Sequence, residues 1–188
     1  MDNNTEKVYL IKWIGPFDTY ESLHEWENNR LIDFPDERYN FYLLQGKKKY
    51  AKNYTYYCGQ TTRTVYQRLR DKDHHFHDIE DRKFGIWIGR FANITPKKSD
   101  INAVEKLITS ELCNLSIGYE QMMNQTNLLP PKYDIYIINE WYNSKNNLEK
   151  KRVKSLSPEQ FIPDLIIYKN DTREMKGTTK IKTLLYLE

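Results

Sequence analysis

The sequence predicts an α+β domain, because short apolar runs of strand length alternate with segments of helical periodicity. The chain has 188 residues, enough for one domain with a real core or for one domain plus a small appendage. Hydrophobic residues make up 39% of it and aromatic residues 14%, including 15 tyrosines. This composition, with its regular patterning, excludes a disordered chain.

The order of the predicted elements follows from apolar runs and from their boundaries. Strands are expected at 7–14, 40–46, 54–59, 84–91, 133–142, 163–169 and 182–188. Helices are expected at 18–27, 64–71 and 101–115. Asp18 with Glu21, and Thr64 with Gln67, have the spacing of residues that cap the first turn of a helix.

Several classes of protein are excluded by what the sequence contains. No apolar run approaches the roughly 18–20 residues of a membrane-spanning helix. The first residues, MDNNTEKVYL, lack the basic start and apolar run of a secretory signal. Cys58 and Cys113 form neither a CxxC pair nor a disulfide framework. We therefore expect a soluble, cytoplasmic protein with no membrane association.

Charge is distributed unevenly, although the net charge is only +3. Residues 1–39 hold 4 basic and 9 acidic residues, whereas residues 40–100 hold 13 basic and 6 acidic residues. The middle third is therefore the candidate for contact with an anionic partner such as a nucleic-acid backbone. A lysine-rich solvated surface explains the same charge equally well.

The helix predicted at 101–115 carries a carboxylate within its apolar face. With Ile101 at zero and about 100° per residue, Glu105 falls at about 40°, inside the sector of the helix's buried aliphatic residues. A carboxylate in that position requires a proton, a cation or a metal ion, because burying an unpaired charge is costly. A salt bridge from the edge of the stripe to an arginine is the structural alternative.

Phenols and a guanidinium gather in the segment that begins at the third predicted strand. Tyr42 and Tyr57 lie on neighbouring predicted strands, and Arg68 lies on the flank of the short helix that follows Gly59. A guanidinium can bind a phosphate through two parallel hydrogen bonds, and a phenol can position or deprotonate a water molecule. Plain packing remains the alternative for either tyrosine alone.

These residues, in their order and approximate spacing, resemble the GIY-YIG endonuclease family. YCGQTTRTVYQRL resembles the second strand, turn and arginine helix of that family, AVEKLI its glutamate helix and MMNQTN its asparagine segment. The resemblance covers roughly residues 40–127. Asn40, Phe41 and Cys58 stand where the family has glycine, isoleucine and isoleucine, whereas both tyrosines and the motif glycine are present.

The resemblance implies a small central three-stranded sheet flanked by helices. Residues 40–130 would then form the nuclease core. Residues 1–39 would be an acidic strand-helix extension, and residues 131–188 a β-rich extension.

The resemblance also implies hydrolysis of DNA phosphodiester bonds with Mg²⁺ or Mn²⁺. Tyr42 or Tyr57 would orient or activate the attacking water, and Arg68 would stabilise charge on the scissile phosphate. Glu105 would be the sole protein carboxylate on one divalent cation, with waters completing its shell. Asn124 would organise the site, with Asn127 as the other assignment.

A histidine often follows the family's arginine by about four residues, where this chain has Lys72. His74 and His75 come slightly later, and we assign the role to His75. The cluster of His74, His75 and His77 also suggests zinc, but no second cluster of ligands matches it, and a solvated polar loop is the simpler interpretation.

Three functions are therefore open at this point. The first is a DNA endonuclease that is restriction-like, homing or associated with a mobile element, for which a homodimer would help to cut both strands. The second is a catalytically inactive nucleic-acid-binding module of the same fold. The third is a protein-interaction domain.

Overall fold

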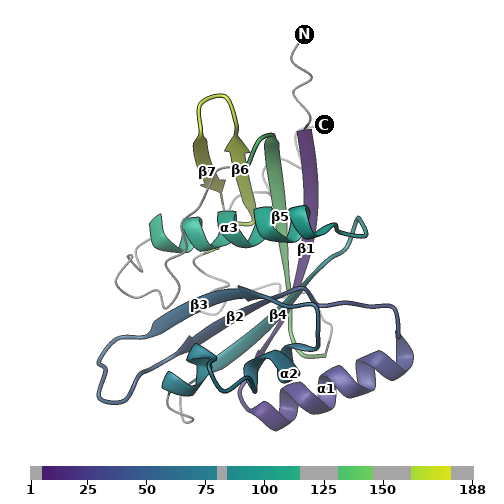
Figure 1. Ribbon diagram of the computed structural model, residues 1–188, viewed down its shortest axis with the longest axis vertical. Coiled ribbons are helices and arrows are strands. Elements are labelled where there is room, and N and C mark those ends of the chain that lie inside the picture. Colours follow the sequence, from purple (N-terminus) through teal and green to yellow (C-terminus); the bar gives the residue numbers. More distant parts are fainter. Residues whose placement is uncertain (1–5, 80–83, 115–130, 146–161, 179–188) are drawn as a thin grey trace.

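A computed structural model describes residues 6–79, 84–114, 131–145 and 162–178 (Figure 1). Its helices are α1 (Tyr20–Asp33), α2 (Val65–Leu69) and α3 (Lys98–Asn114), with a 3₁₀ turn, η1 (His75–Asp78). Its strands are β1 (Glu6–Phe17), β2 (Phe41–Gly46), β3 (Thr55–Gln60), β4 (Gly85–Phe91), β5 (Asp134–Tyr142), β6 (Leu165–Lys169) and β7 (Glu174–Thr178).

All of these strands join in one curled sheet, in the order β3-β2-β4-β1-β5-β6-β7. The β1–β5 pair is parallel and the other neighbouring pairs are antiparallel, so the sheet is mixed. The prediction of a small three-stranded sheet flanked by helices is therefore wrong. Strands β3, β2 and β4 form one end of a seven-stranded sheet.

Strand β1 is the reason for the larger sheet. Its 12 residues are long enough to pair with β4 along one edge and with β5 along the other. Trp13 lies opposite Gly89 on one side and opposite Trp141 on the other, where the two indole rings stack with centroids 5.5 Å apart. The Nε1–H of Trp13 donates to Oδ1 of Asn139 at 2.9 Å, which adds a buried side-chain hydrogen bond to the β1–β5 pair.

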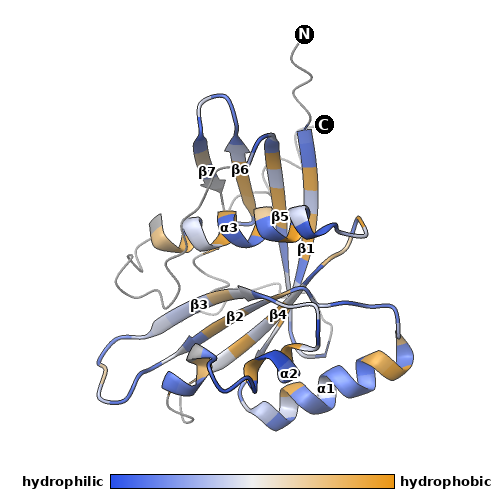
Figure 2. Ribbon diagram, viewed as in Figure 1, coloured by the Kyte–Doolittle hydropathy of each residue, from blue (hydrophilic) through white to orange (hydrophobic). Residues whose placement is uncertain are grey.

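The two faces of the sheet have separate cores. Alternation along β2 sends Phe41 and Leu43 to the face covered by α3, and Tyr42 and Leu44 to the face covered by α1 and α2. Figure 2 shows the same alternation as hydrophobic and hydrophilic bands along β1 and β5. Residues that are neighbours in the sequence are thereby delivered to different layers.

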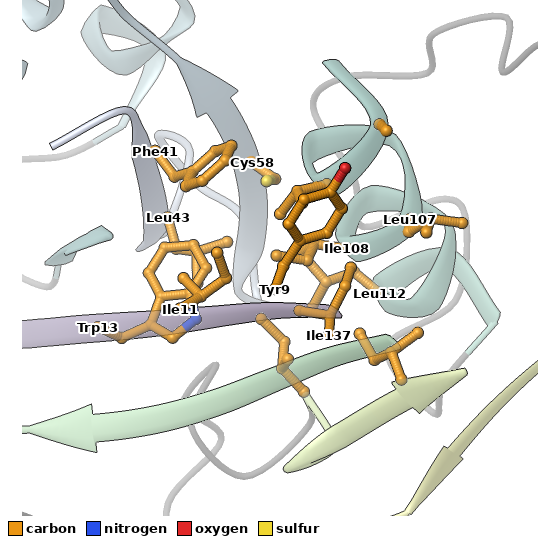
Figure 3. Packing of buried hydrophobic residues seen from close by; sticks show 14 of the residues in the cluster. Tyr9, Ile11, Trp13, Phe41, Leu43, Cys58, Leu107, Ile108, Leu112 and Ile137 are labelled. Carbon is orange, nitrogen blue, oxygen red and sulfur yellow. The ribbon is translucent and has the colours of Figure 1, made fainter. Parts of the chain in front are cut away.

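The core beneath α3 fixes the position of that helix (Figure 3). Ile108 and Leu112 of α3 pack with Phe41 and Cys58 of the sheet, and the ring of Tyr9 fills the space beside them. All five side chains are almost entirely buried. Glu105, one turn before Ile108, is therefore held next to the edge strand β3.

The helix boundaries confirm one capping prediction and correct another. Thr64 caps α2 by accepting a hydrogen bond from the backbone N–H of Gln67 at 3.2 Å, as expected. Helix α1 is capped by Thr19 with Ser22, one residue later than predicted. None of the helices described is both long enough and apolar enough to cross a membrane. The strand predicted at 182–188 lies outside the described residues.

Candidate functional site

Tyr42 and Tyr57 form a stacked pair on the face that carries α1 and α2. Their ring centroids are 5.8 Å apart and the rings are inclined by 16°. Gly59 lies opposite Tyr42 in the β2–β3 register. A Cβ atom on Gly59 would overlap the ring and hydroxyl of Tyr42, so this glycine provides the space that the phenol occupies.

His74 completes the aromatic cluster. Its Nδ1 accepts a hydrogen bond from the backbone N–H of Phe76 at 2.9 Å, so the proton of the neutral ring is on Nε2. Nε2 lies 2.8 Å from the hydroxyl of Tyr42 and therefore donates to it. Tyr42 can then donate its own proton to Tyr57, which gives a directed chain of hydrogen bonds from His74 through Tyr42 to Tyr57.

The two phenols differ in accessibility and in the stability of their ionised forms. Tyr42 is fully buried, whereas Tyr57 is half-buried and reached by solvent. Burial raises the pKa of both hydroxyls. For Tyr57, the hydrogen bond from Tyr42 and the charge of Arg68 oppose that rise in pKa. Tyr57 is therefore the member of the pair suited to meet a water molecule.

Arg68 projects from α2 beside the two phenols. Val65 and Leu69 bury the inner face of this short helix and leave Arg68 on its flank, as the sequence predicts. Burial tends to lower the pKa of Arg68, but hydrogen bonds to Asp71 and to Tyr42 outweigh it and keep the guanidinium charged. Nη1 of Arg68 lies 2.5 Å from Oδ2 of Asp71, which holds the side chain in place.

Glu27 fixes α2 against α1 and so positions Arg68. Its Oε1 and Oε2 accept hydrogen bonds from the backbone N–H groups of Val65 and Tyr66, each at 2.8 Å. Burial raises the pKa of this carboxyl, and the two backbone hydrogen bonds oppose the rise. The sequence analysis missed Glu27, although its place four residues after Leu23, on the buried face of α1, was a signal for it.

Glu105 lies on α3 beside the end of β3. Its Oε2 accepts a hydrogen bond from Nε2 of Gln60 at 2.6 Å. Burial raises the pKa of the carboxyl, while the bond from Gln60 and the charges of Lys98 and Lys106 act against that rise. Among the described residues, the hydrogen-bond partner of this carboxylate is thus an amide, and no arginine forms the salt bridge considered as the alternative.

Glu105 and Arg68 act on the same phenol from opposite sides of the sheet. Because β3 is the edge strand, the face carrying α3 and the face carrying α2 meet along it. The charge of Glu105 raises the pKa of Tyr57, whereas the charge of Arg68 lowers it. The pKa of Tyr57 therefore responds to charges on both faces of the sheet.

The remaining predicted residues differ in what the structure describes. His75 begins η1, but its side chain is outside the described part of the chain. Asn124 and Asn127 also lie outside the described residues. The adjacent His74 is the histidine in contact with Tyr42, and nothing in the spacing of the two histidines distinguished them beforehand.

A metal site would have to be built on few carboxylates. Among the described residues, no group of three or more histidine, cysteine, aspartate or glutamate side chains could hold a metal ion. However, Glu105 Oε2 and Asn102 Oδ1 both converge on Nε2 of Gln60. Two oxygen donors with water molecules fit Mg²⁺, which retains several waters when it binds protein.

Comparisons of the chain with protein-family models, with curated proteins and with solved structures find no match.

Proposed function

We propose that this protein is a divalent-metal-dependent endonuclease that hydrolyses DNA phosphodiester bonds. The observation that supports this most is the arrangement of Tyr57, Tyr42, His74 and Arg68, in which a directed chain of hydrogen bonds and a guanidinium meet at one solvent-accessible phenol. Hydrolysis of a phosphate ester requires both a positioned water and positive charge near the phosphate.

Tyr57 positions the attacking water and, as its phenolate, takes the proton of that water while the new bond to phosphorus forms and the bond to the leaving oxygen breaks. Before this step the negative charge is on the oxygen of Tyr57. The hydrogen bond from Tyr42 stabilises that charge, and His74 in turn donates to Tyr42. Tyr42 and His74 are buried behind the accessible phenol of Tyr57 and need not touch the substrate.

Arg68 binds the scissile phosphate and stabilises the charge that grows on its oxygens in the transition state. Its side chain is 31% exposed, so the guanidinium is accessible from solvent. Asp71 accepts from it in the free protein, and also accepts from Nη2 of Arg63 at 2.6 Å. A phosphate would replace Asp71 as the acceptor for Arg68, while Asp71 would keep Arg63.

A divalent cation, held by Glu105 with Asn102, would neutralise the leaving oxygen or lower the pKa of a bound water. The contribution of this chain is to provide two oxygen ligands from α3 at the edge of the sheet. Both are half-buried, which excludes part of the competing bulk water.

A DNA backbone has a basic path on both sides of these residues. Residues 38–70 include eight lysines and arginines and no aspartate or glutamate. The β2–β3 turn exposes Lys48, Lys49 and Lys52, together with Tyr50, whose side chain is 90% exposed. Beyond the other end of these strands, a cleft of about 1020 Å³ is lined by Arg38, Arg63, Arg90 and Lys98, and also by Asp33, Asp36 and Glu37, so that its lining carries a small excess of positive charge.

One observation favours a second function, a module that binds nucleic acid without cutting it. Arg68 is engaged by Asp71 and Glu105 by Gln60, so both charged groups have protein partners already. A binding module would retain the basic path and keep these partners when DNA is bound.

Cleavage of supercoiled plasmid DNA in Mg²⁺ or Mn²⁺ tests the proposal. The wild-type protein is expected to nick the plasmid, and Arg68→Ala and Glu105→Ala are each expected to reduce the rate by about 10²–10³-fold. Arg70→Ala is the matched control for the loss of one positive charge from this segment, because Arg70 is exposed directly after the same helix, with its guanidinium over the ring of Tyr66. Retention of DNA in a gel shift without any cleavage would select the binding module instead.

A further inference from the structure

We propose that Asn102 and Glu105 together form the cation site, and that the side chain of Gln60 competes with the cation for their two oxygens. This inference rests on the proposed function, because it concerns the metal that the hydrolysis would use. It adds to these two oxygen ligands a residue that sets the affinity of the site for the cation.

The two oxygens converge on a single atom. Oε2 of Glu105 lies 2.6 Å and Oδ1 of Asn102 lies 3.0 Å from Nε2 of Gln60. Both ligands come from α3 and are three residues apart, so they project from the same side of the helix. The NH₂ group of Gln60 donates hydrogen bonds to both oxygens. A divalent cation at the same point would likewise be bound by both oxygens, so the two ligands suit either occupant.

The orientation of the Gln60 amide is fixed from its other end. Nζ of Lys98 donates to Oε1 of Gln60 at 2.7 Å, so the nitrogen must face α3. Gln60 is the last residue of the edge strand β3 and is half-buried, so its side chain can rotate towards solvent without breaking the sheet. Cation binding therefore requires rotation of the Gln60 side chain, with loss of its hydrogen bond from Lys98, and no movement of the backbone.

The strength of the hydrogen bond from Gln60 to Glu105 determines how much the removal of the Gln60 amide changes the affinity for the cation. Hydrogen bonds to a charged group contribute about 1.5–3 kcal/mol, and this bond must be broken before the cation can use the oxygen. Removing the Gln60 amide should therefore raise the affinity for the cation by about tenfold or more. If Gln60 only ties α3 to β3, its removal would lower stability and leave the affinity unchanged.

Binding of Mn²⁺, followed by isothermal titration calorimetry and by the electron paramagnetic resonance signal of free Mn²⁺, tests the proposal on the full chain. Gln60→Ala and Gln60→Met are expected to bind Mn²⁺ about tenfold more tightly than the wild type. Asn102→Ala is expected to bind it more weakly, and Glu105→Gln to lose the site. Gln67→Ala is the matched control, because Gln67 is an exposed glutamine on α2.

An unchanged or weaker affinity in a folded Gln60→Met variant overturns the competition, even if the wild type cleaves DNA and binds Mn²⁺ through Glu105. An unchanged affinity in Asn102→Ala overturns the second ligand. If neither the wild type nor the Gln60 variants bind Mn²⁺, this inference fails and the metal requirement of the proposed function fails with it. Thermal melting of each variant identifies any loss of folding separately.

Discussion

Gly59 lies directly against the ring of Tyr42, so closely that the phenol occupies the space of a side chain at position 59. The two residues face each other across the β2–β3 pair, and the hydroxyl of Tyr42 is held there by His74. The position of the Tyr42 ring thus requires a glycine at position 59, and the chain of hydrogen bonds to Tyr57 depends on it.

Gly59→Ala is therefore expected to displace Tyr42, to lower the free energy of unfolding by about 1–3 kcal/mol, and to reduce cleavage. Urea unfolding and plasmid nicking measure the two effects. The same substitution in a Tyr42→Ala background should cost less, because the Tyr42 ring is gone and only the contact with the Tyr57 ring remains. An equal loss in the free energy of unfolding in the two backgrounds would show that the contact with Tyr42 is not what excludes a side chain at position 59.

The two tyrosines are expected to differ in kinetic effect. Tyr57→Phe removes the phenol that meets the water and should slow cleavage by about 10²-fold or more. Tyr42→Phe leaves that phenol in place and removes only the hydrogen bond that stabilises its ionised form, so its effect should be smaller. Single-turnover cleavage measures both. If Tyr42→Phe were the slower variant, the order of the proposed chain would be reversed.

Glu27→Ala is expected to destabilise the protein and to misplace Arg68. It leaves the backbone N–H groups of Val65 and Tyr66 without their buried acceptors, at a cost of about 2–4 kcal/mol. Glu27→Gln keeps one acceptor oxygen and should cost less. Urea unfolding gives the stabilities, and DNA cleavage by the folded fraction shows whether α2 has moved. A loss of stability with an unchanged cleavage rate would show that Glu27 stabilises the fold without positioning Arg68.

Glu111, on the buried side of α3 against Gly177, is expected to make stability depend on pH. Burial raises its folded-state pKa above the ordinary value of 4.5. Below pH 4.5 the Glu111 carboxyl is protonated in both the folded and the unfolded protein. As the pH rises through the folded-state pKa, the folded protein must bury a charged carboxylate and therefore loses stability. Glu111→Gln removes that loss, so its stability relative to the wild type should be greater at about pH 7 than at about pH 4. Urea unfolding across this range provides the check, and a constant difference would contradict it.

The exposed lysines of the β2–β3 turn are expected to contribute to DNA binding by neutralising phosphates. Replacing Lys48, Lys49 and Lys52 by alanine should weaken binding and reduce the dependence of log K on log salt by about 0.9 for each phosphate that is no longer neutralised. The matched control replaces three exposed lysines elsewhere on the described surface: Lys132, Lys145 and Lys176. An equal change in both triple variants would mean that only net charge matters.

Local elements could be predicted from the sequence because their signals are local. Strands β1 to β6 and the three helices lie where apolar runs and helical periodicity placed them, with shifts at their ends that are largest for α1, which continues to Asp33 instead of ending at residue 27. The turn after Gly59 and the burial of Val65 and Leu69 also follow from neighbouring residues, so Arg68 could be placed on the flank of α2. Strand β7 was missed because Glu174–Thr178 has neither apolar alternation nor a β-branched core.

The assembly of the sheet could not be predicted in the same way. The pairing of β1 with β5 joins residues about 130 positions apart, and no feature of either strand specifies that partner. The same limit applies to the site. The partnership of Tyr42 with His74 and of Glu105 with Gln60 depends on which elements pack together, whereas the resemblance supplied only the residue types and their order.

The central position of β1 has a consequence for how the protein is made. This strand leaves the ribosome long before its parallel neighbour β5, which is synthesised more than a hundred residues later. Until then a long, apolar edge is open to other nascent chains, which is the condition that favours aggregation and chaperone binding. The yield of native protein should therefore depend on what shields Tyr9–Ile14 during translation.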